Sequence, residues 1–249
     1  MVSLPGFSFR RWGAWSPAMF DAQGWQAWVR EETSLNASEE MAPAKAIPPL
    51  LRRRASLPGR AALEVLSTPM LAYADQPIVF CSRHGEVGRS LAIQQALAEV
   101  GQVSPQEFSM SVHNATPGLF LIARQSRARV TAVASENRLA LSGMFEALSW
   151  LADGAPSVIL VFCDAPLPAL FQPFTDNEPA CFAFALEMMA GNDYRLVHGD
   201  PLPPGTQREK GTTSLSLLRF VLDETRNALS LTESADWQLQ RLAPEADCA

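Results

Sequence analysis

Apolar and polar residues along the chain form two kinds of pattern that predict five β-strands. Phe7–Trp15 largely alternates between the two residue types, which is typical of a strand. Continuous apolar runs within 76–85 and 156–166 indicate strands that are covered on both faces. The segments 129–135 and 179–191 complete the set. The last segment could be a strand or a helix, but its two sides are equally apolar, which favours a strand.

Helical periodicity fills most of the sequence between these strands. Residues 86–101 predict an amphipathic helix that turns Val87, Leu91 and Leu97 inward and ends at Gly101. A further helix is expected to start at Ser104 as its N-cap and to be kinked or divided near 117–118, where Pro and Gly follow each other. Two more helices are predicted, over Asn137–Leu151 and Thr212–Leu231.

The alternation of strands and helices predicts one α/β domain over residues 1–249. About five strands would form a mixed sheet covered by helices on both faces. The Ser-, Ala- and Pro-rich stretch at about 33–50 is expected to be a loop, and about 243–249 a disordered tail.

The composition limits the function classes that are open to this chain. Its 249 residues carry a formal net charge of −6 with a pI near 5.2, so there is no general attraction to nucleic acid or anionic lipid. No apolar run reaches the roughly 18 residues that span a bilayer. Arg10 and Arg11 interrupt any signal-peptide core. We therefore expect a cytoplasmic protein with no membrane span and no nucleic-acid partner.

Candidate chemistry centres first on the strand-to-helix corner Ser135-Glu136-Asn137. Many α/β enzymes mount a nucleophile at such a corner, where the helix N-terminus supplies positive potential. None of the three residues is a cysteine, and neither Glu136 nor Asn137 could form a thioester.

Cys81 offers a possible nucleophile elsewhere. It lies three residues before His84, and His113 could fold nearby, so a Cys–His pair could serve a stand-alone acyltransferase or thioesterase. The alternative, which we favour, is that Cys81 is a small apolar core residue, since free cysteine is among the most buried residue types. The three histidines lack metal-ligand spacing, so we expect no metal and no cofactor.

Three segments together carry a resemblance to a known family: Leu51–Val65 (LRRRASLPGRAALEV), Phe80–Leu97 (FCSRHGEVGRSLAIQQAL) and Ser104–Arg124 (SPQEFSMSVHNATPGLFLIAR). The SVHNA stretch is fairly specific in this context. From about Phe7 to Leu222 the chain resembles the β-ketoacyl synthase-like N-terminal domain of chain length factors, which occur in aryl polyene pathways. The resemblance implies half of a thiolase-like fold.

The resemblance also implies a loss of catalysis. Ketosynthases carry their cysteine at the start of the helix after the third strand, and that position maps to Glu136 or Asn137 here. They take two histidines, or a histidine and an asparagine, from a second homologous half that we expect this chain to lack. A non-catalytic subunit is therefore expected.

A role for such a subunit follows from the same resemblance. In ketosynthase dimers the third strand, here 129–135, pairs antiparallel with its partner across a two-fold axis. The segment just before SVHNA closes the far end of the partner's acyl tunnel. The residues that map to this interface and tunnel end are Glu107, Phe108, Met110, Ser111, Val112, His113, Asn114, Arg129, Thr131 and Val133.

The expected partners are a full-length β-ketoacyl-acyl carrier protein synthase, in a heterodimer, and transiently an acyl carrier protein. Such carrier proteins are acidic and bear a phosphate, which Arg52, Arg53 and Arg54 could contact. A solvated or internally paired cluster is the equal alternative. The predicted function is an inactive chain length factor that stabilises a ketosynthase and shapes its acyl tunnel. A homodimeric scaffold that binds acyl carrier protein is the other alternative.

Overall fold

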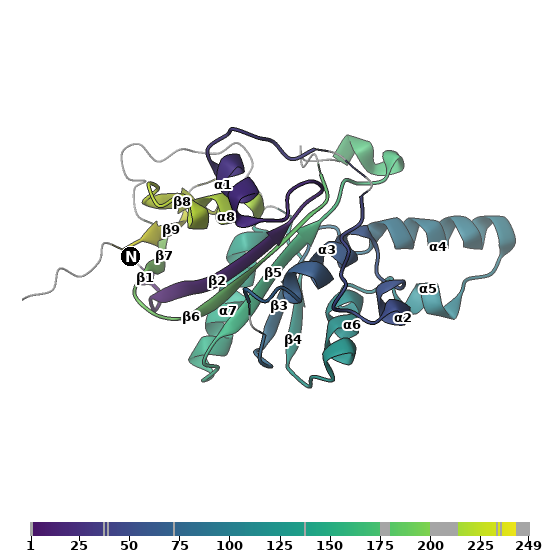
Figure 1. Ribbon diagram of the computed structural model, residues 1–249, viewed down its shortest axis with the longest axis horizontal. Helices are drawn as coiled ribbons and strands as arrows, with labels where there is room; N and C mark the ends of the chain where they lie inside the picture. The colour runs from purple at the N-terminus through teal and green to yellow at the C-terminus, as the bar shows by residue number, and fades with distance from the viewer. Residues whose placement is uncertain are drawn as a thin grey trace, which may run out of the picture.

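Nine strands form a single mixed sheet in the described part of the chain (Figure 1). The computed structural model describes residues 2–36, 38, 40–71, 73–136, 138–174, 180–199, 214–232, 234 and 236–242. Eight strands follow in the order β4-β3-β5-β6-β2-β7-β9-β8, and β1 pairs with β7. The strands are β1 (Val2–Ser3), β2 (Phe7–Trp15), β3 (Ile78–Cys81), β4 (Val130–Val133), β5 (Val158–Asp164), β6 (Phe182–Ala190), β7 (Tyr194–His198), β8 (Ala228–Ser230) and β9 (Trp237–Arg241).

The mixed α/β sheet is confirmed, but the predicted number of about five strands is too low. β2 to β6 are the five predicted strands, and β3 runs parallel to both β4 and β5. β6 pairs antiparallel with β5 and β2. The sequence pattern missed four strands: β1 has two residues, β7 and β9 have five each, and β8 has three. Length alone does not explain this, since β3 has only four residues; β3 was predicted because all of its residues are buried and form an apolar run.

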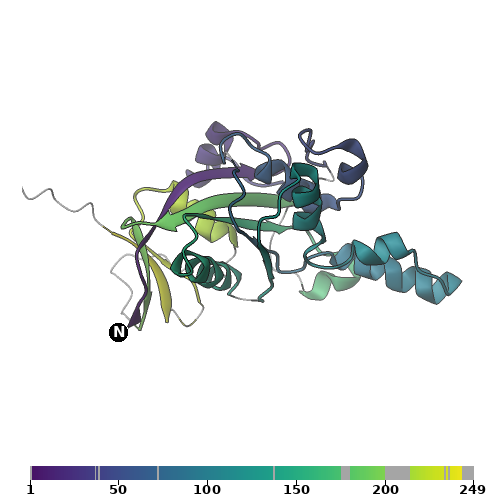
Figure 2. The same ribbon diagram turned by 90° about the horizontal axis from the view of Figure 1, so that it is seen from below.

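Helices cover both faces of the sheet, as predicted (Figure 2). One face carries α3 (Leu57–Leu66) and α6 (Ala115–Arg124), and the other carries α7 (Leu139–Ala152) and α8 (Ser214–Leu222). The remaining elements are α1 (Ala22–Val29), α2 (Pro49–Arg52), α4 (Val87–Val100), α5 (Pro105–Ser109) and the 3-10 turn η1 (Ala169–Phe174).

The central strands separate two hydrophobic cores. Alternate side chains of a strand point to opposite faces, so Val158, Leu160 and Phe162 of β5 join the core under α7 and α8. The residues between them, Ile159 and Val161, join the core under α3. All seven residues of β5 are buried, which explains the unbroken apolar run in the sequence.

The helical region that begins at Ser104 is divided into two pieces, but not where the sequence pattern placed the break. Ser104 is the N-cap of α5, as predicted, and its hydroxyl accepts from the Glu107 N–H at 3.4 Å. The chain leaves the helix at Met110 and re-enters one at Ala115. Pro117 is the third residue of α6, where a helix has no intrahelical partner for the N–H that proline lacks.

The predicted helix Thr212–Leu231 is wrong in its second half. α8 ends at Leu222, and 228–230 form β8; residues 212 and 213 lie outside the described part of the chain. The Asp223 carboxylate accepts from the Thr225 N–H at 3.1 Å and from the Arg226 Nε at 2.9 Å, which holds the chain in a turn. The expected tail at 243–249 also lies outside the described residues.

The arm, defined as residues 87–109 with α4 and α5, projects from the body in both ribbon views (Figures 1 and 2). α4 begins and ends as predicted, with Gly101 in the left-handed conformation as its C-cap. The expectation that Leu97 faces inward is wrong, because Leu97 is 55% exposed. The sheet does not extend far enough to cover the outer half of α4, so its apolar side chains stay in solvent.

Candidate functional site

β4 lies at one end of the sheet and pairs with β3 alone among the described strands. Its four residues are not buried: Val130, Thr131 and Val133 are half-buried and Ala132 is exposed. The opposite end of the sheet differs, because Leu229 and Ser230 of β8 are buried. The predicted pairing strand is therefore an open edge of the sheet that the described residues form.

The ladder between β3 and β4 shows which backbone groups are free. The Ser82 N–H donates to the Val133 carbonyl at 3.2 Å, so the backbone groups of Val133 face β3. These groups alternate in direction along a strand, and those of Thr131 face β3 as well. The N–H and C=O of Val130 and Ala132 therefore point away from the sheet, where another strand could pair with them.

Arg129 flanks this edge and contacts α7. Its guanidinium lies 4.2 Å from the ring centroid of Trp150, and its Nη1 is 3.7 Å from a carboxylate oxygen of Asp153. Both charged side chains are more than half exposed, so the ion pair contributes little to stability. A predicted interface residue is thereby held beside the free strand.

The corner after β4 contains no thiol in its described residues. Ser135 is half-buried and Glu136 is exposed, and neither has a side-chain contact in the described structure that would prepare it for catalysis. Arg138 occupies the N-cap of α7 without a side-chain cap bond. Asn137, the other position that maps to the ketosynthase cysteine, lies outside the described residues.

The predicted tunnel-end residues lie on and after α5, away from β4 in the chain. Phe108 is 64% exposed and Val112 is 46% exposed, whereas Met110 is buried in the core under α3. Ser111 donates its hydroxyl to the Phe108 carbonyl at 2.8 Å. Glu107 lines a pocket of about 340 Å³ at the base of the arm. Exposed and buried side chains are thus mixed in this predicted set.

His113 and Asn114 lie at the start of α6. The His113 ring meets the edge of Phe80, with 5.9 Å between ring centroids, and burial lowers the pKa of this histidine. A side chain at Gly85 would come within 3.5 Å of the His113 Nδ1. Asn114 is exposed and is the N-cap residue of α6, but its side chain makes no cap bond. His113 therefore has a packing role that the sequence did not reveal.

Cys81 is fully buried on the face of β3 that meets α7. Burial raises the pKa of its thiol well above the ordinary value. Gly143 of α7 approaches so closely that a Cβ there would lie 2.6 Å from the Cys81 Sγ. Phe80, against which His113 packs, belongs to the core on the opposite face. Cys81 and His113 thus lie on different sides of the sheet and do not form a catalytic pair.

The other described cysteines are equally enclosed. Cys163 and Cys181 are buried in the core under α3. Burial raises the pKa of Cys181 to about 12 and that of Cys163 well above its ordinary value. A buried, protonated thiol is a poor nucleophile.

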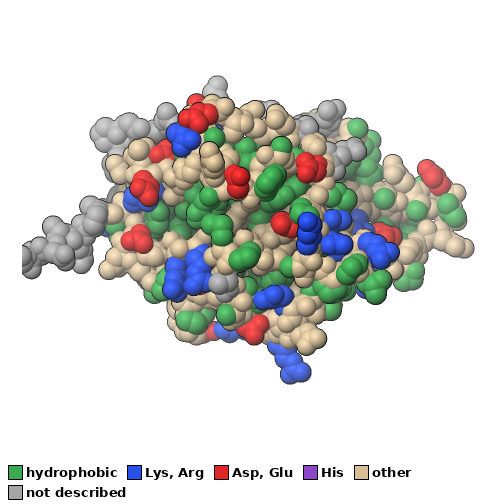
Figure 3. All heavy atoms as spheres, in the orientation of Figure 1, with side chains coloured by type: hydrophobic (Ala, Val, Ile, Leu, Met, Phe, Trp, Pro, Cys, Tyr) green, Lys and Arg blue, Asp and Glu red, His purple; other side chains and the backbone are tan. Residues whose placement is uncertain are grey.

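The basic cluster on and beside α2 is divided between internal and exposed side chains. Arg52 donates to the Pro43 carbonyl at 3.4 Å, and Arg60 donates to the Ala42 carbonyl at 2.9 Å. Arg53 and Arg54 are exposed. Figure 3 shows Lys and Arg side chains gathered on this face near α2 and the base of the arm. The cluster is therefore partly structural and partly open to a partner.

A buried carboxylate that the sequence analysis missed connects the carboxyl ends of β3 and β5. Asp164 accepts from the Ser82 hydroxyl at 2.9 Å and from the backbone N–H groups of Arg83 and His84 at 3.0 and 3.1 Å. Burial nevertheless raises the pKa of Asp164. These bonds hold the turn that leads into α4, so Asp164 has a structural role. Its place directly after an apolar run was the signal available in the sequence.

Metal and membrane sites do not emerge from the described structure. No group of three His, Cys, Asp or Glu side chains among the described residues could hold a metal ion. Within the same residues, each helix is too short or too polar to cross a bilayer.

Comparison with known proteins gives one matching family. The model of the β-ketoacyl synthase N-terminal domain matches residues 25–240. No curated protein sequence matches the chain.

Several solved structures share the fold. A chain in the structure of a ketosynthase (ApeO) in complex with its chain length factor (ApeC) from Xenorhabdus doucetiae is 24% identical with a TM-score of 0.81, and the match covers 96% of this chain and 100% of that one. The ishigamide ketosynthase/chain length factor is 13% identical with a TM-score of 0.63, covering 78% of this chain and 66% of that one. A β-ketoacyl synthase from Burkholderia phymatum STM815 is 13% identical with a TM-score of 0.57, and the match covers 94% of this chain and 76% of that one.

Proposed function

Because this chain belongs to the β-ketoacyl synthase N-terminal domain family, we propose that it is a non-catalytic chain length factor. In this role it pairs with a full-length ketosynthase, stabilises it and shapes the end of its acyl tunnel. The pathway would be an aryl polyene or related fatty-acid-type assembly on an acyl carrier protein. The overall likeness to a structure that contains a ketosynthase and its chain length factor supports this choice.

The open edge of β4 is the observation that carries the proposal. The outward N–H and C=O groups of Val130 and Ala132 have no partner strand in the described molecule. An edge of this kind invites pairing with another chain unless it is protected. Antiparallel pairing with a ketosynthase strand would satisfy these groups and join two sheets into one.

Among the described residues no thiol is accessible, which supports a non-catalytic role. The resemblance maps the cysteine of a condensing enzyme to Glu136 or Asn137, and neither side chain can form the required thioester. Cys81, Cys163 and Cys181 are buried with raised pKa values. The geometry therefore gives no support to an acyltransferase that uses Cys81.

The exposed residues after α4 are the part of this chain that would shape the tunnel. Phe108 and Val112 present apolar side chains to solvent, and Glu107 adds a charge beside them. In a complex, their bulk would limit how far an acyl chain can extend, because a packed wall resists extra methylenes. Arg53 and Arg54, which are exposed on a neighbouring surface, would contact the acidic carrier protein.

Size-exclusion chromatography of this chain with its cognate full-length ketosynthase tests the proposal. We expect a 1:1 complex that Ala132→Pro weakens strongly, since proline removes an outward N–H and leaves the ladder to β3 intact. Ala132→Ser is the matched control, because it keeps the N–H at almost the same size. A chain that stays a monodisperse monomer with the ketosynthase present contradicts the proposal. A homodimer that binds acyl carrier protein but does not bind the ketosynthase would favour the scaffold alternative.

A further inference from the structure

Packing does little to fix the direction of the arm. None of the fourteen residues of α4 is buried, and the apolar side chains of Leu97, Val100 and Phe108 are 55%, 71% and 64% exposed. The pocket of about 340 Å³ at the base of the arm lies between α4, the start of α3 and the segment after β5. Because apolar packing holds α4 so weakly and a cavity lies at its base, other contacts must fix the orientation of this helix.

Arg89 supplies polar contacts at that base. Its Nη1 lies 2.5 Å from the Glu107 Oε2, which joins α4 to α5. Its Nε lies 3.3 Å from the Glu86 Oε2, and its Nη2 donates to the backbone carbonyl of Arg54. One guanidinium therefore contacts both helices of the arm and the chain that leads into α3. Lysine, with a single ammonium group, could not match this planar fork.

Glu86 connects the same cluster to the body of the molecule. Its Oε1 accepts from the Ser56 hydroxyl at 2.9 Å and from the Thr116 hydroxyl at 3.3 Å, which ties it to α3 and α6. The Glu86 side chain is 7% exposed and that of Arg89 is 17% exposed. An ion pair this enclosed is screened little by salt, and removing one member leaves a buried charge without its partner.

We propose that Arg89 is a positioning residue that holds the arm in the orientation a partner subunit needs. The guanidinium fixes the angle between α4 and the body through Glu86 and Arg54, and the angle between α4 and α5 through Glu107. Phe108, which follows Glu107, is thereby held in place. The importance of this orientation for a partner rests on the proposed function, whereas the clamp itself is a property of the isolated chain.

Amide hydrogen exchange of the full chain, followed by mass spectrometry, tests the clamp without any partner. Arg89→Ala should speed exchange across residues 90–109 by about tenfold or more while β5 and α3 keep the wild-type rate, as expected for a local opening. Arg89→Lys should give an intermediate rate. Arg124→Ala, which changes an exposed arginine on α6, is the control and should leave the arm unchanged.

Three outcomes decide the proposal. If Arg89→Ala leaves the exchange of the arm at the wild-type rate, the clamp is wrong. If Arg89→Ala unfolds the whole chain, Glu107→Gln takes its place, because it removes only a half-exposed partner, and it must still speed exchange in the arm. Affinity for the cognate ketosynthase is measured in parallel: a wild-type chain that does not bind refutes the proposed function but not the clamp.

Discussion

α3 and α4 are neighbouring helices in the chain that use their apolar side chains in opposite ways. Six of the ten residues of α3 are buried, and this helix contacts the central strands β5 and β6. None of the fourteen residues of α4 is buried. α3 is therefore part of the folding core, whereas the apolar side chains of α4 contribute little to folding and are available to a partner. The comparison separates residues that maintain the fold from residues that can serve function.

The largest expected effect on stability follows from replacing a buried leucine of α3. Leu63 is fully buried, so Leu63→Ala should lower the free energy of unfolding by about 2–5 kcal/mol. Leu97→Ala on α4 is the matched substitution and should change it by no more than about 0.5 kcal/mol. Urea denaturation followed by circular dichroism measures both. Equal losses in the two variants would show that α4 is packed more tightly than described.

A glycine in each helix offers a second test of the comparison. A Cβ at Gly59 of α3 would lie 2.6 Å from the Thr116 Oγ1, so Gly59→Ala should destabilise the chain by about 1–3 kcal/mol. Nothing lies within 4 Å of a Cβ at Gly88 of α4. Gly88→Ala should therefore stabilise the chain by up to about 1 kcal/mol, the usual gain in helix propensity. A stabilising Gly59→Ala would contradict the close approach of α3 and α6.

Two residues after α4 extend the comparison to function. Phe108 is exposed, so Phe108→Ala should change the stability by less than about 0.5 kcal/mol and should shift the product lengths of the co-expressed ketosynthase. Met110 is buried, so Met110→Ala should cost about 2 kcal/mol or more. Met110→Ala is thus a poor probe of the tunnel, since any change in product could follow from unfolding. An unchanged product distribution with Phe108→Ala, measured by mass spectrometry, would remove the claim that this residue shapes the tunnel.

The smallest expected effect is a pH dependence at Glu86, where α3 and α4 meet. The groups that face its carboxylate are Ser56, Thr116 and Arg89, and burial raises its pKa despite them. A raised pKa means that the charged form is less favourable in the folded chain than in the unfolded one. The resulting loss of stability is present at neutral pH and disappears as the pH falls below the unfolded pKa, about 4.3.

Denaturation of the wild type and Glu86→Gln across this pH range measures that effect. The stability of the wild type should rise relative to the variant as the pH is lowered from about 7 to about 4. A difference that stays constant, or that moves in favour of the variant, would mean that the carboxylate is stabilised as an anion at this site.

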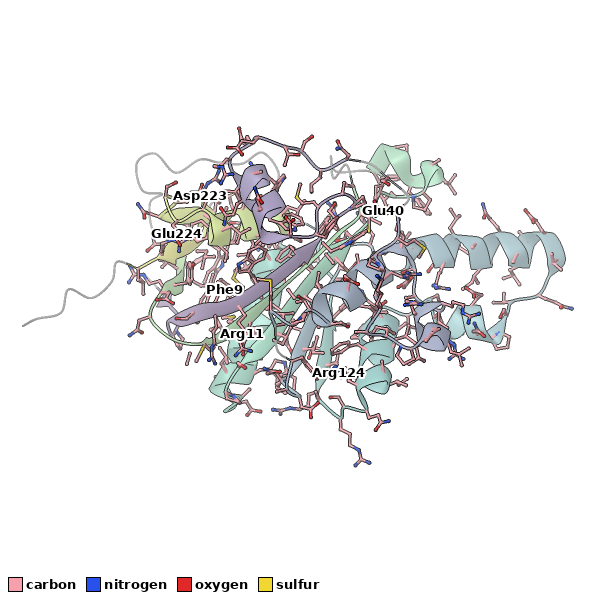
Figure 4. The ribbon with its side chains drawn as sticks, in the orientation of Figure 1. Phe9, Arg11, Glu40, Arg124, Asp223 and Glu224 are labelled. Atoms are coloured by element: carbon pink, nitrogen blue, oxygen red, sulfur yellow. The ribbon has the colours of Figure 1, made fainter. Side chains whose placement is uncertain are left out.

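The central strands were predictable because strands that are buried on both faces consist of apolar residues. β5 is buried on both faces and reads as an unbroken apolar run, and β2 matches its predicted bounds. The helix prediction failed after Leu222 because side-chain bonds end α8 there. Figure 4 shows Asp223 and Glu224 at the end of that helix. The Asp223 carboxylate binds residues two and three positions ahead, a local competition that hydrophobic periodicity does not record.

The candidate site was predictable only in part. The edge position of β4 came from family resemblance, because a strand of three half-buried residues and one exposed residue does not reveal its neighbours. The contacts of Arg89 and Asp164 could not be predicted from the sequence for a different reason. Asp164 and Ser82 are 82 positions apart in the chain, and Arg89 and Arg54 are 35 apart, so only the folded chain brings them together.

Pairing at β4 is tested by the exchange rate of the Ala132 amide, measured by nuclear magnetic resonance in the free chain and in the complex with the cognate ketosynthase. We expect fast exchange of this amide in the free chain and strong protection in the complex. The Thr131 amide, which faces β3, should be protected in both states and serves as the internal reference. An Ala132 amide already protected in a monomeric free chain, or still unprotected in a stable complex, would contradict pairing at this edge.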